Sequence, residues 1–282
     1  PFKSIFADEV KIGERTIDGN QLKWSVFHDF PAQRMYTVMQ EWVFPFIKTL
    51  HADKNSAYSK YMDDAIFKLP TPLLLSKVVD ALDDIYAKMA EIKEADIRGD
   101  VYEYLLGKIA AAGENGQFRT PRHIIAMIVK LMQPTLKDKI LDPAMGSAGF
   151  LLESATYINE KYKKELMQTD NLKYYKTEMF TGFDTDPSML RIGAMNMMLH
   201  GVEDPCITYQ DSLSGDNTER DIYTLIMANS PFTGSVFQEE ISKDLLALCN
   251  TRKTELLFMA LFIKMLNDGG RCASIVPDGV LF

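Results

Sequence analysis

The feature that most constrains the fold is a regular alternation of short apolar runs and helix-length segments after residue 138. Such an alternation is typical of parallel strands, because a helix is the usual crossover between two parallel neighbours. Strands are expected at residues 139–141, 179–183, 206–209, 224–228 and 272–276, and helices at residues 150–163, 187–200 and 254–267. The sequence therefore predicts an α/β fold with an open, mostly parallel sheet that helices cover on both faces.

The chain before residue 113 shows a helical pattern instead. Apolar residues recur there at helical spacing in three segments: 32–50, 75–92 and 101–109. Pro45 is expected to kink or end the first of these helices. Gly113 and Gly116 lie in a small, polar stretch that suits a loop. We therefore expect an all-helical N-terminal domain, residues 1–112, ahead of the α/β domain, residues 113–282.

Three of the expected strands are followed by acidic residues: Asp142, Asp184 and Asp211. Ligands of open α/β sheets bind beyond the carboxyl ends of the strands. The first of these residues opens a turn in which Gly146 and Gly149 let the backbone approach a ligand without a Cβ in the way. A carboxylate at Asp184 can accept two hydrogen bonds from a ribose diol, and Asp211 with Ser212 can accept from an adenine amine. This set predicts a nucleoside-containing ligand.

A dinucleotide-binding site is the natural competitor of this interpretation. The G-x-G-x-x-G signature of such sites is absent, and the loop begins with Asp142 and Pro143 instead. A cofactor that is a sulfonium bearing an amino acid has no pyrophosphate to place at a helix N-terminus. The loop therefore favours S-adenosylmethionine over a dinucleotide.

A second loop carries the residues for chemistry: Asn229, Ser230, Pro231 and Phe232. The amino group of adenine is a poor nucleophile, because its lone pair is delocalised into the ring. Two acceptors, the side-chain carbonyl of Asn229 and the backbone carbonyl of Ser230, would localise that lone pair and aim it at a methyl group. Phe232 would stack on the base, which must leave the duplex to reach such a pocket.

In these segments the chain resembles the amino methyltransferases of DNA, and most of all the modification subunits of type I restriction systems. The matching segments follow the family's order: residues 116–122, 141–150, 182–187, 195–201, 229–232, 253–258 and 276–282. Residues 34–50 and 99–106 also resemble that family's N-terminal helical domain. The resemblance implies a methyltransferase domain over residues 113–282 that transfers a methyl group from S-adenosylmethionine to N6 of adenine in DNA.

The resemblance also assigns roles to single residues. It implies that Asp184 binds the ribose, that Asp211 lies near the adenine, and that Asn229, Pro231 and Phe232 form the target-adenine site with Ser230. The other residues expected at the cofactor are Gln117, Phe118, Arg119, Thr120, Pro121, Arg122, Asp142, Ala144, Gly146, Ser147 and Ala148. Thr120 and Pro121 are expected to start a helix, Thr120 as its N-cap and Pro121 in its first turn.

In such systems a separate specificity subunit reads the DNA sequence, a second copy of the modification subunit joins it, and a restriction subunit can be added. The net charge of −8 agrees with this division of labour, because an acidic chain alone should hold duplex DNA weakly. We therefore expect DNA, a specificity subunit and a second modification subunit as partners. Because the chain stops right after a strand-like run, we also expect the domain to continue beyond Phe282.

Two residues depart from the family's pattern and keep alternatives open. Ser230 stands where the family usually has Pro, which leaves the loop freer, and Arg119 stands where an aromatic residue is frequent. One alternative is a catalytically weak scaffold subunit of a restriction complex. Another is a protein-glutamine methyltransferase, which uses a related loop.

Other features place the chain in a general class. No apolar run approaches the roughly 20 residues that span a bilayer, and no signal peptide is recognisable. The three cysteines match no zinc or redox spacing, and the four histidines show no metal-ligand spacing. We expect a cytoplasmic protein with reduced thiols, no metal and no membrane partner.

Overall fold

The computed structural model describes residues 6–49, 57–63, 65–90, 120–232 and 235–280. The chain forms two compact units, residues 1–97 and 98–282. The boundary expected at residue 112 lies outside the described residues and stays a prediction. The expected helix over residues 101–109 lies outside them as well.

The N-terminal unit opens with a two-stranded antiparallel sheet of β1 (Glu9–Ile12) and β2 (Arg15–Asp18). Gly13 makes the turn between them with φ of +61°, a conformation that suits glycine. The helices that follow are α1 (Trp24–Phe27), α2 (Ala32–Val38), α3 (Phe44–Thr49), α4 (Ala57–Met62) and α5 (Pro72–Ala90). The expectation of an all-helical N-terminal domain is therefore wrong, because this unit also contains the β1–β2 hairpin.

The helix expected over residues 32–50 is present but interrupted. Between α2 and α3, residues Met39–Val43 form a π-helical turn, in which the N–H of Phe44 bonds to the carbonyl of Met39. Pro45 follows at once and has no N–H with which to continue the α-helical ladder. Leu75 and Val79 of α5 share the unit's buried core with Met35 and Val38 of α2, so the predicted apolar stripes do meet.

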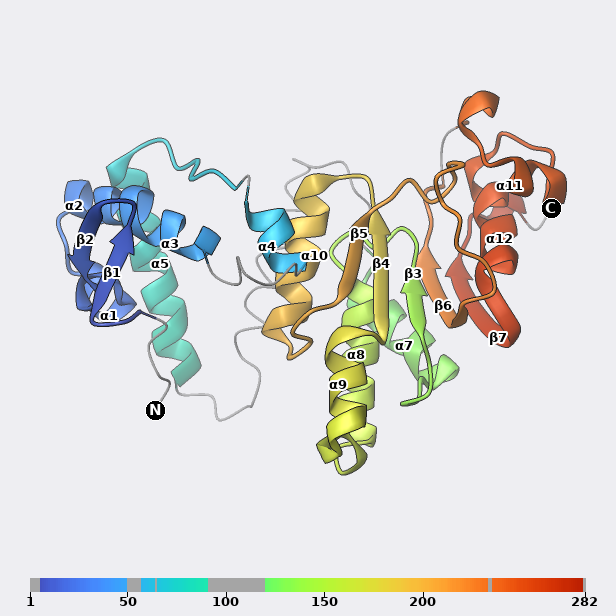
Figure 1. The fold of residues 1–282 in the computed structure, drawn as a ribbon, viewed down its shortest axis with the longest axis horizontal. Helices are drawn as coiled ribbons and strands as arrows, with labels where there is room; N and C mark the ends of the chain where they lie inside the picture. Colours follow the sequence, from blue (N-terminus) through green and yellow to red (C-terminus); the bar gives the residue numbers. More distant parts are fainter. Residues whose placement is uncertain (1–5, 50–56, 64, 91–119, 233–234, 281–282) are drawn as a thin grey trace. The chain divides into compact units, whose positions relative to one another are not determined.

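The second unit contains a five-stranded parallel sheet in the order β5-β4-β3-β6-β7 (Figure 1). Its strands are β3 (Ile140–Asp142), β4 (Phe180–Asp184), β5 (Cys206–Tyr209), β6 (Tyr223–Asn229) and β7 (Leu266–Ile275). Its helices are α7 (Arg122–Met132), α8 (Gly149–Lys161), α9 (Thr169–Thr177), α10 (Pro187–Leu199), α11 (Lys243–Leu248) and α12 (Thr254–Met265). The predicted open parallel sheet is confirmed.

The order of the strands creates a reversal at the centre of the sheet. From β3 the chain moves outward to β4 and β5, and then crosses back to β6 and β7 on the other side. Because crossovers are right-handed, α8 and α10 cover one face of the sheet and α12 covers the other. The carboxyl ends of β3 and β6 lie next to each other at this switch point, where such folds bind ligands.

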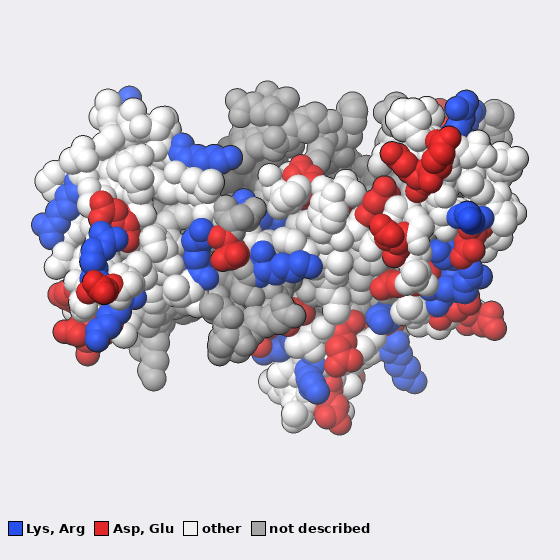
Figure 2. All heavy atoms as spheres, turned by 45° about the horizontal axis from the view of Figure 1, so that its top comes forward, with Lys and Arg blue, Asp and Glu red and all other residues white. Residues whose placement is uncertain are grey.

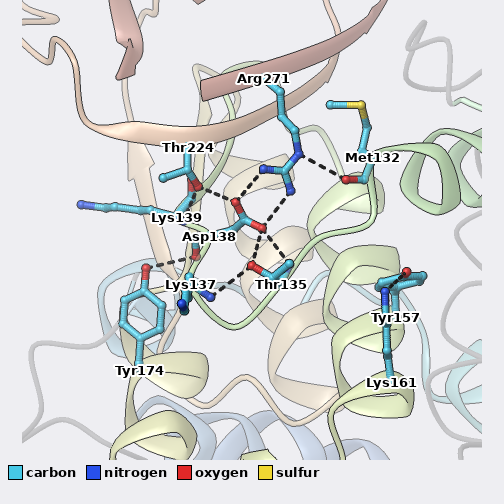
Figure 3. Close-up of polar contacts among 10 residues, drawn as sticks. All are labelled: Met132, Thr135, Lys137, Asp138, Lys139, Tyr157, Lys161, Tyr174, Thr224 and Arg271. Carbon is cyan, nitrogen blue, oxygen red and sulfur yellow. Dashed lines mark hydrogen bonds and ion pairs between the residues drawn. The ribbon is translucent and has the colours of Figure 1, made fainter. Parts of the chain in front are cut away.

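A polar cluster holds the opposite, amino end of β3 (Figure 3). Asp138 is 3% exposed, and its carboxylate forms a two-pronged ion pair with the guanidinium of Arg271 on β7, at 3.0 and 2.9 Å. It also accepts hydrogen bonds from the hydroxyl of Thr224 on β6 and from the N–H and hydroxyl of Thr135. Arg271 donates a further bond to the carbonyl of Met132, the last residue of α7. One buried carboxylate thus ties β6, β7 and α7 to the start of β3.

In the part of the chain that the structure describes, no helix is long and apolar enough to cross a membrane. Its three cysteines, Cys206, Cys249 and Cys272, are free thiols.

Candidate active site

The loop after β3 is folded back over the end of β4. The N–H of Gly146 donates to the carboxylate of Asp184 at 3.0 Å, and the N–H of Met145 donates to the carbonyl of Phe183 at 3.0 Å. Gly146 and Ala148 both adopt positive φ, at +51° and +65°, which turns the chain tightly into helix α8. A Cβ on Gly146 would meet no atom within 4 Å. The positive φ of the backbone, not crowding by neighbours, therefore favours glycine at position 146, and the space where a Cβ would stand is open.

Met145 anchors this loop by filling space that two glycines leave empty. A Cβ added to Gly182 of β4 would collide with the Met145 sulfur, and one added to Gly193 of α10 would lie 2.9 Å from its methyl group. Met145 itself is 4% exposed. The loop thus rests on the sheet through one buried thioether.

Asp142, the last residue of β3, is 2% exposed at the centre of the sheet. Its side chain accepts one hydrogen bond from the described residues, from the N–H of Ala144 at 3.1 Å. Burial, together with the nearby carboxylate of Asp184, raises the pKa of Asp142 to about 7, although the Ala144 bond opposes this. Near neutral pH the group is therefore poised between its neutral and charged forms.

The ends of β4 and β5 are tied to the same loop. Asp184 is partly buried, which raises its pKa, and it accepts hydrogen bonds from the N–H groups of Gly146 and Asp186. Asp211 is exposed and accepts from the N–H of Leu213. Ser212 is 5% exposed, and its hydroxyl donates to the carbonyl of Pro143 at 2.6 Å. The structure therefore brings Asp142, Asp184 and Asp211 to one edge of the sheet, as predicted.

The second predicted loop begins on the last residue of β6, Asn229. Ser230 is 2% exposed, Phe232 is half-buried, and Pro231 is exposed. The Oδ1 atom of Asn229 and the hydroxyl of Ser230 are both buried and find no hydrogen-bond partner among the described residues. A buried polar atom without a partner costs about 1–3 kcal/mol, so such atoms are frequent where a ligand supplies the missing bond.

The predicted residues before α7 are only partly described. Gln117, Phe118 and Arg119 lie outside the described residues, and Thr120 is half-buried, while Pro121 and Arg122 are exposed. Pro121 is the N-cap of α7 and has no side-chain cap, so the expectation that Thr120 would cap the helix is wrong. Pro121 has an extended ψ of 137° and so lies outside the helix, which begins at Arg122, one residue later than expected.

Asn196 on α10 is a residue to which the sequence analysis gave no role. It is fully buried, and its side-chain N–H donates to the carbonyl of Ser147 at 3.0 Å. This bond fixes the backbone of the loop in which Gly146, Ser147 and Ala148 were predicted to contact the cofactor. An amide between Met195 and Met197, in the apolar second half of α10, is the signal that could have identified it.

The residues present fit a nucleoside that carries an electrophilic group. Asp184 offers carboxylate acceptors, the loop at Gly146 offers open space, and Asn229 offers a buried acceptor that lacks a partner. These groups stand at the ends of β4, β3 and β6, three adjacent strands. The fold and this arrangement define the class of S-adenosylmethionine-dependent methyltransferases.

Comparisons with known proteins agree. The N-6 DNA Methylase family matches residues 93–282, so the chain belongs to this family. The chain is 31% identical over 246 residues to the methylase subunit of the type I restriction enzyme EcoEI from Escherichia coli, covering 85% of this chain and 49% of that protein. It is also 31% identical over 220 residues to the EcoKI methylase subunit from Escherichia coli K12, covering 75% and 41%. The chain thus spans about half the length of the curated relatives it matches.

Solved structures show the same fold. A chain from a type I restriction-modification assembly superposes with a TM-score of 0.65 at 24% identity, covering 94% of this chain and 54% of that one. A type I methyltransferase subunit from Streptococcus thermophilus superposes with a TM-score of 0.61 at 20% identity, covering 93% and 57%.

Proposed function

We propose that this chain transfers a methyl group from S-adenosylmethionine to N6 of adenine in DNA, as the modification subunit of a type I restriction-modification system. The observation that carries the proposal is the buried Oδ1 of Asn229, an acceptor without a partner at the switch point of a methyltransferase fold. The EcoEI and EcoKI relatives described above are methylase subunits of type I restriction enzymes, which supports the same reaction.

The cofactor supplies a methyl group on a positively charged sulfur. Asn229 Oδ1 and the carbonyl of Ser230 accept the two N6 hydrogens of the extruded adenine and so concentrate its lone pair on nitrogen. The bound cofactor would give up its methyl group to the N6 lone pair that these acceptors hold in place, and the electron pair of the broken S–CH3 bond would stay on sulfur. The surplus proton leaves N6 for water afterwards, so no strong base is needed. Phe232 stacks on the base and keeps it from rotating.

For the cofactor we propose the roles given by the resemblance. Asp184 holds the ribose hydroxyls, Asp211 lies near the adenine, and Asp142, Ala144, Gly146, Ser147 and Ala148 contact the cofactor. The resemblance assigns residues 117–122 to the cofactor contacts as well. The fixed backbone at Gly146 and the Asn196 bond to Ser147 support this, because a pre-formed loop loses little freedom when a ligand binds.

The proposed partners are DNA, a specificity subunit that reads the sequence, a second copy of this subunit and a restriction subunit. Figure 2 shows that the described Lys and Arg side chains on the face drawn are scattered among Asp and Glu, with no single basic area. With a net charge of −8, the chain alone would hold DNA weakly. This supports a complex in which other chains supply most of the affinity for DNA.

The test is Asn229→Ala in the subunit assembled with its specificity partner. Methyl incorporation into DNA should fall by about 100-fold or more, because one of two preorganised acceptors is lost, while cofactor affinity by calorimetry changes little. Asn159→Ala on the exposed surface of α8 is the matched control and should keep full incorporation. Equal incorporation by wild type and Asn229→Ala would refute the assigned role.

One alternative has a specific observation in its favour. Ser230 replaces the family's usual proline and buries a hydroxyl that finds no partner among the described residues, which fits a subunit with weakened catalysis. Cofactor binding by the wild-type complex without methyl incorporation into DNA would favour a scaffold role. Label found in protein glutamine instead would favour the other alternative.

A further inference from the structure

Asp142 presents an unusual combination of burial and sparse hydrogen bonding. Its carboxylate is 2% exposed, yet it accepts one hydrogen bond from the described residues, from the Ala144 N–H. A buried carboxylate normally has a cationic partner or several donors. Asp142 has neither, so its negative charge is uncompensated within the described part of the chain.

The order of the strands indicates which part of the cofactor lies over Asp142. This step rests on the proposed function. The ribose is assigned to Asp184 at the end of β4, and the target amine to Asn229 at the end of β6. Strand β3 lies between these two strands, and Asp142 is its last residue. The sulfur joins the ribose to the transferred methyl group, so it must lie between the two sites, above the end of β3.

In the part of the chain that the structure describes, the groups around Asp142 carry no positive charge. Strand β6, on one side, carries no acidic or basic residue, and β4, on the other side, ends in Asp184, whose charge is also negative. Residues 143–148 of the following loop carry no ionisable side chain, and the first turn of α8, which begins at Gly149, carries none before Glu153. The α12 residues that share a buried core with Leu141 are apolar. The described residues thus supply no cation at this position, and the bound ligand carries one.

We propose that Asp142 senses the charge of the methyl donor: near neutral pH it keeps about half of its proton when the site is empty or holds the neutral product, and it loses that proton when the sulfonium binds. The step is balanced, because the carboxyl proton passes to the solvent and the carboxylate left behind faces the positive sulfur. S-adenosylmethionine and S-adenosylhomocysteine differ only in one methyl group and its positive charge. Asp142 thereby favours the substrate over the product and helps the product to leave after transfer.

The sign of the pH effect follows directly. Burial holds the pKa of Asp142 near 7 in the empty protein, and a nearby positive charge lowers the pKa of a carboxyl group. Affinity for S-adenosylmethionine should therefore rise as the pH increases from 6 to 8. The titration of Asp142 should leave the affinity for S-adenosylhomocysteine nearly unchanged over the same range. At pH 7, close to this pKa, binding of S-adenosylmethionine should release about half a proton from Asp142.

Isothermal titration calorimetry of the subunit in buffers with different ionisation enthalpies tests this, because the buffer dependence of the heat counts the protons released. Wild type should release about half a proton more at pH 7 with S-adenosylmethionine than with S-adenosylhomocysteine. Sinefungin, which carries an amine in place of the sulfonium, should behave like the substrate. Equal proton release with the substrate and the product in the wild type would overturn the proposal.

Two variants assign the proton. In Asp142→Asn the difference in proton release should vanish, and the preference for substrate over product should fall about tenfold, since one charge interaction is removed. A proton released by the ligand's own amino group is released in this variant too. The proton release measured for Asp142→Asn is therefore subtracted from that of the wild type. Asp211→Asn, a change at an exposed carboxylate, should weaken both ligands alike and keep the difference. A difference that survives in Asp142→Asn would contradict the assignment.

The outcomes also separate this inference from the proposed function. If neither ligand binds the wild-type protein, the proposed function fails. If both bind and methyl transfer proceeds without differential proton release, the proposed function stands and the charge-sensing role of Asp142 is wrong. Should Asp142→Asn fail to fold, the wild-type comparison of the three ligands over pH 6–8 still decides the question.

Discussion

Two aspartates flank the same short strand and are buried to the same degree, yet their surroundings are opposite. Asp138, at the amino end of β3, is 3% exposed, and Asp142, at the carboxyl end, is 2% exposed. Asp138 receives bonds from Arg271, Thr224 and Thr135, which lower its pKa against the effect of burial (Figure 3). Asp142 receives one bond from Ala144, and its pKa rises. Burial alone therefore does not decide the charge of a carboxyl group.

The difference shows how the two edges of the sheet are used. At the amino edge the chain itself supplies every partner that Asp138 needs, so that edge stabilises the fold. At the carboxyl edge Asp142, Asn229 and Ser230 are buried with few or no partners among the described residues. That edge gives up stability, and a ligand is the natural source of the missing interactions.

The largest expected effect comes from breaking the satisfied end. Asp138→Ala should lower the free energy of unfolding by about 4 kcal/mol, because it leaves the Arg271 guanidinium and two threonine hydroxyls without their acceptor. Urea denaturation at pH 7 measures this, with the exposed Asp170→Ala on α9 as the matched control. Because the folded pKa of Asp138 is lowered, its contribution is present above pH 3.8 and is lost as the pH falls through the folded pKa. A loss below 1 kcal/mol would contradict the role assigned to the cluster.

The unsatisfied end should respond in the opposite direction. Without cofactor at pH 8, Asp142→Asn should raise the free energy of unfolding by about 2 kcal/mol, because it removes a buried charge. The folded pKa of Asp142 is raised, so the wild type should lose stability as the pH rises from about 4 to 7, and the variant should not. Urea denaturation across this range measures both. A destabilised variant at pH 8 would show that Asp142 is already compensated in the empty protein.

The smallest effect is expected at Ser230. Ser230→Ala removes a buried hydroxyl that finds no partner among the described residues and should raise the free energy of unfolding by about 1 kcal/mol. Methyl incorporation should stay within a few-fold of wild type, because the backbone carbonyl is retained. Ser230→Pro should behave similarly with a stiffer loop. Loss of stability in Ser230→Ala would mean that the hydroxyl has a partner in the working protein.

The sequence predicted the α/β sheet because its strands and helices are strongly patterned. The predicted strand over residues 206–209 has the observed bounds, and the others differ by one residue, except β7, which begins six residues earlier than expected. The convergence of Asp142, Asp184 and Asp211 followed from one rule, that parallel strands end at the same edge. Local pattern and topology were sufficient for these features.

Other features could not be predicted, because they depend on contacts between distant residues. Asp138 and Arg271 are 133 residues apart, and neither belongs to a recognisable motif. The β1–β2 hairpin has strands of only four residues, too short for an alternating pattern to stand out. The pKa of Asp142 depends on how few donors reach it, and a sequence gives no count of missing hydrogen bonds.

The hydroxyl of Ser212 donates to the carbonyl of Pro143, and the N–H of Gly146 donates to the carboxylate of Asp184. These two hydrogen bonds join the ends of three neighbouring strands without any contribution from a ligand. A loop held in this way should exchange its amide hydrogens slowly even in the empty protein. Ligand capture should then resemble docking onto a rigid surface, with an association rate set by diffusion and access rather than by loop rearrangement.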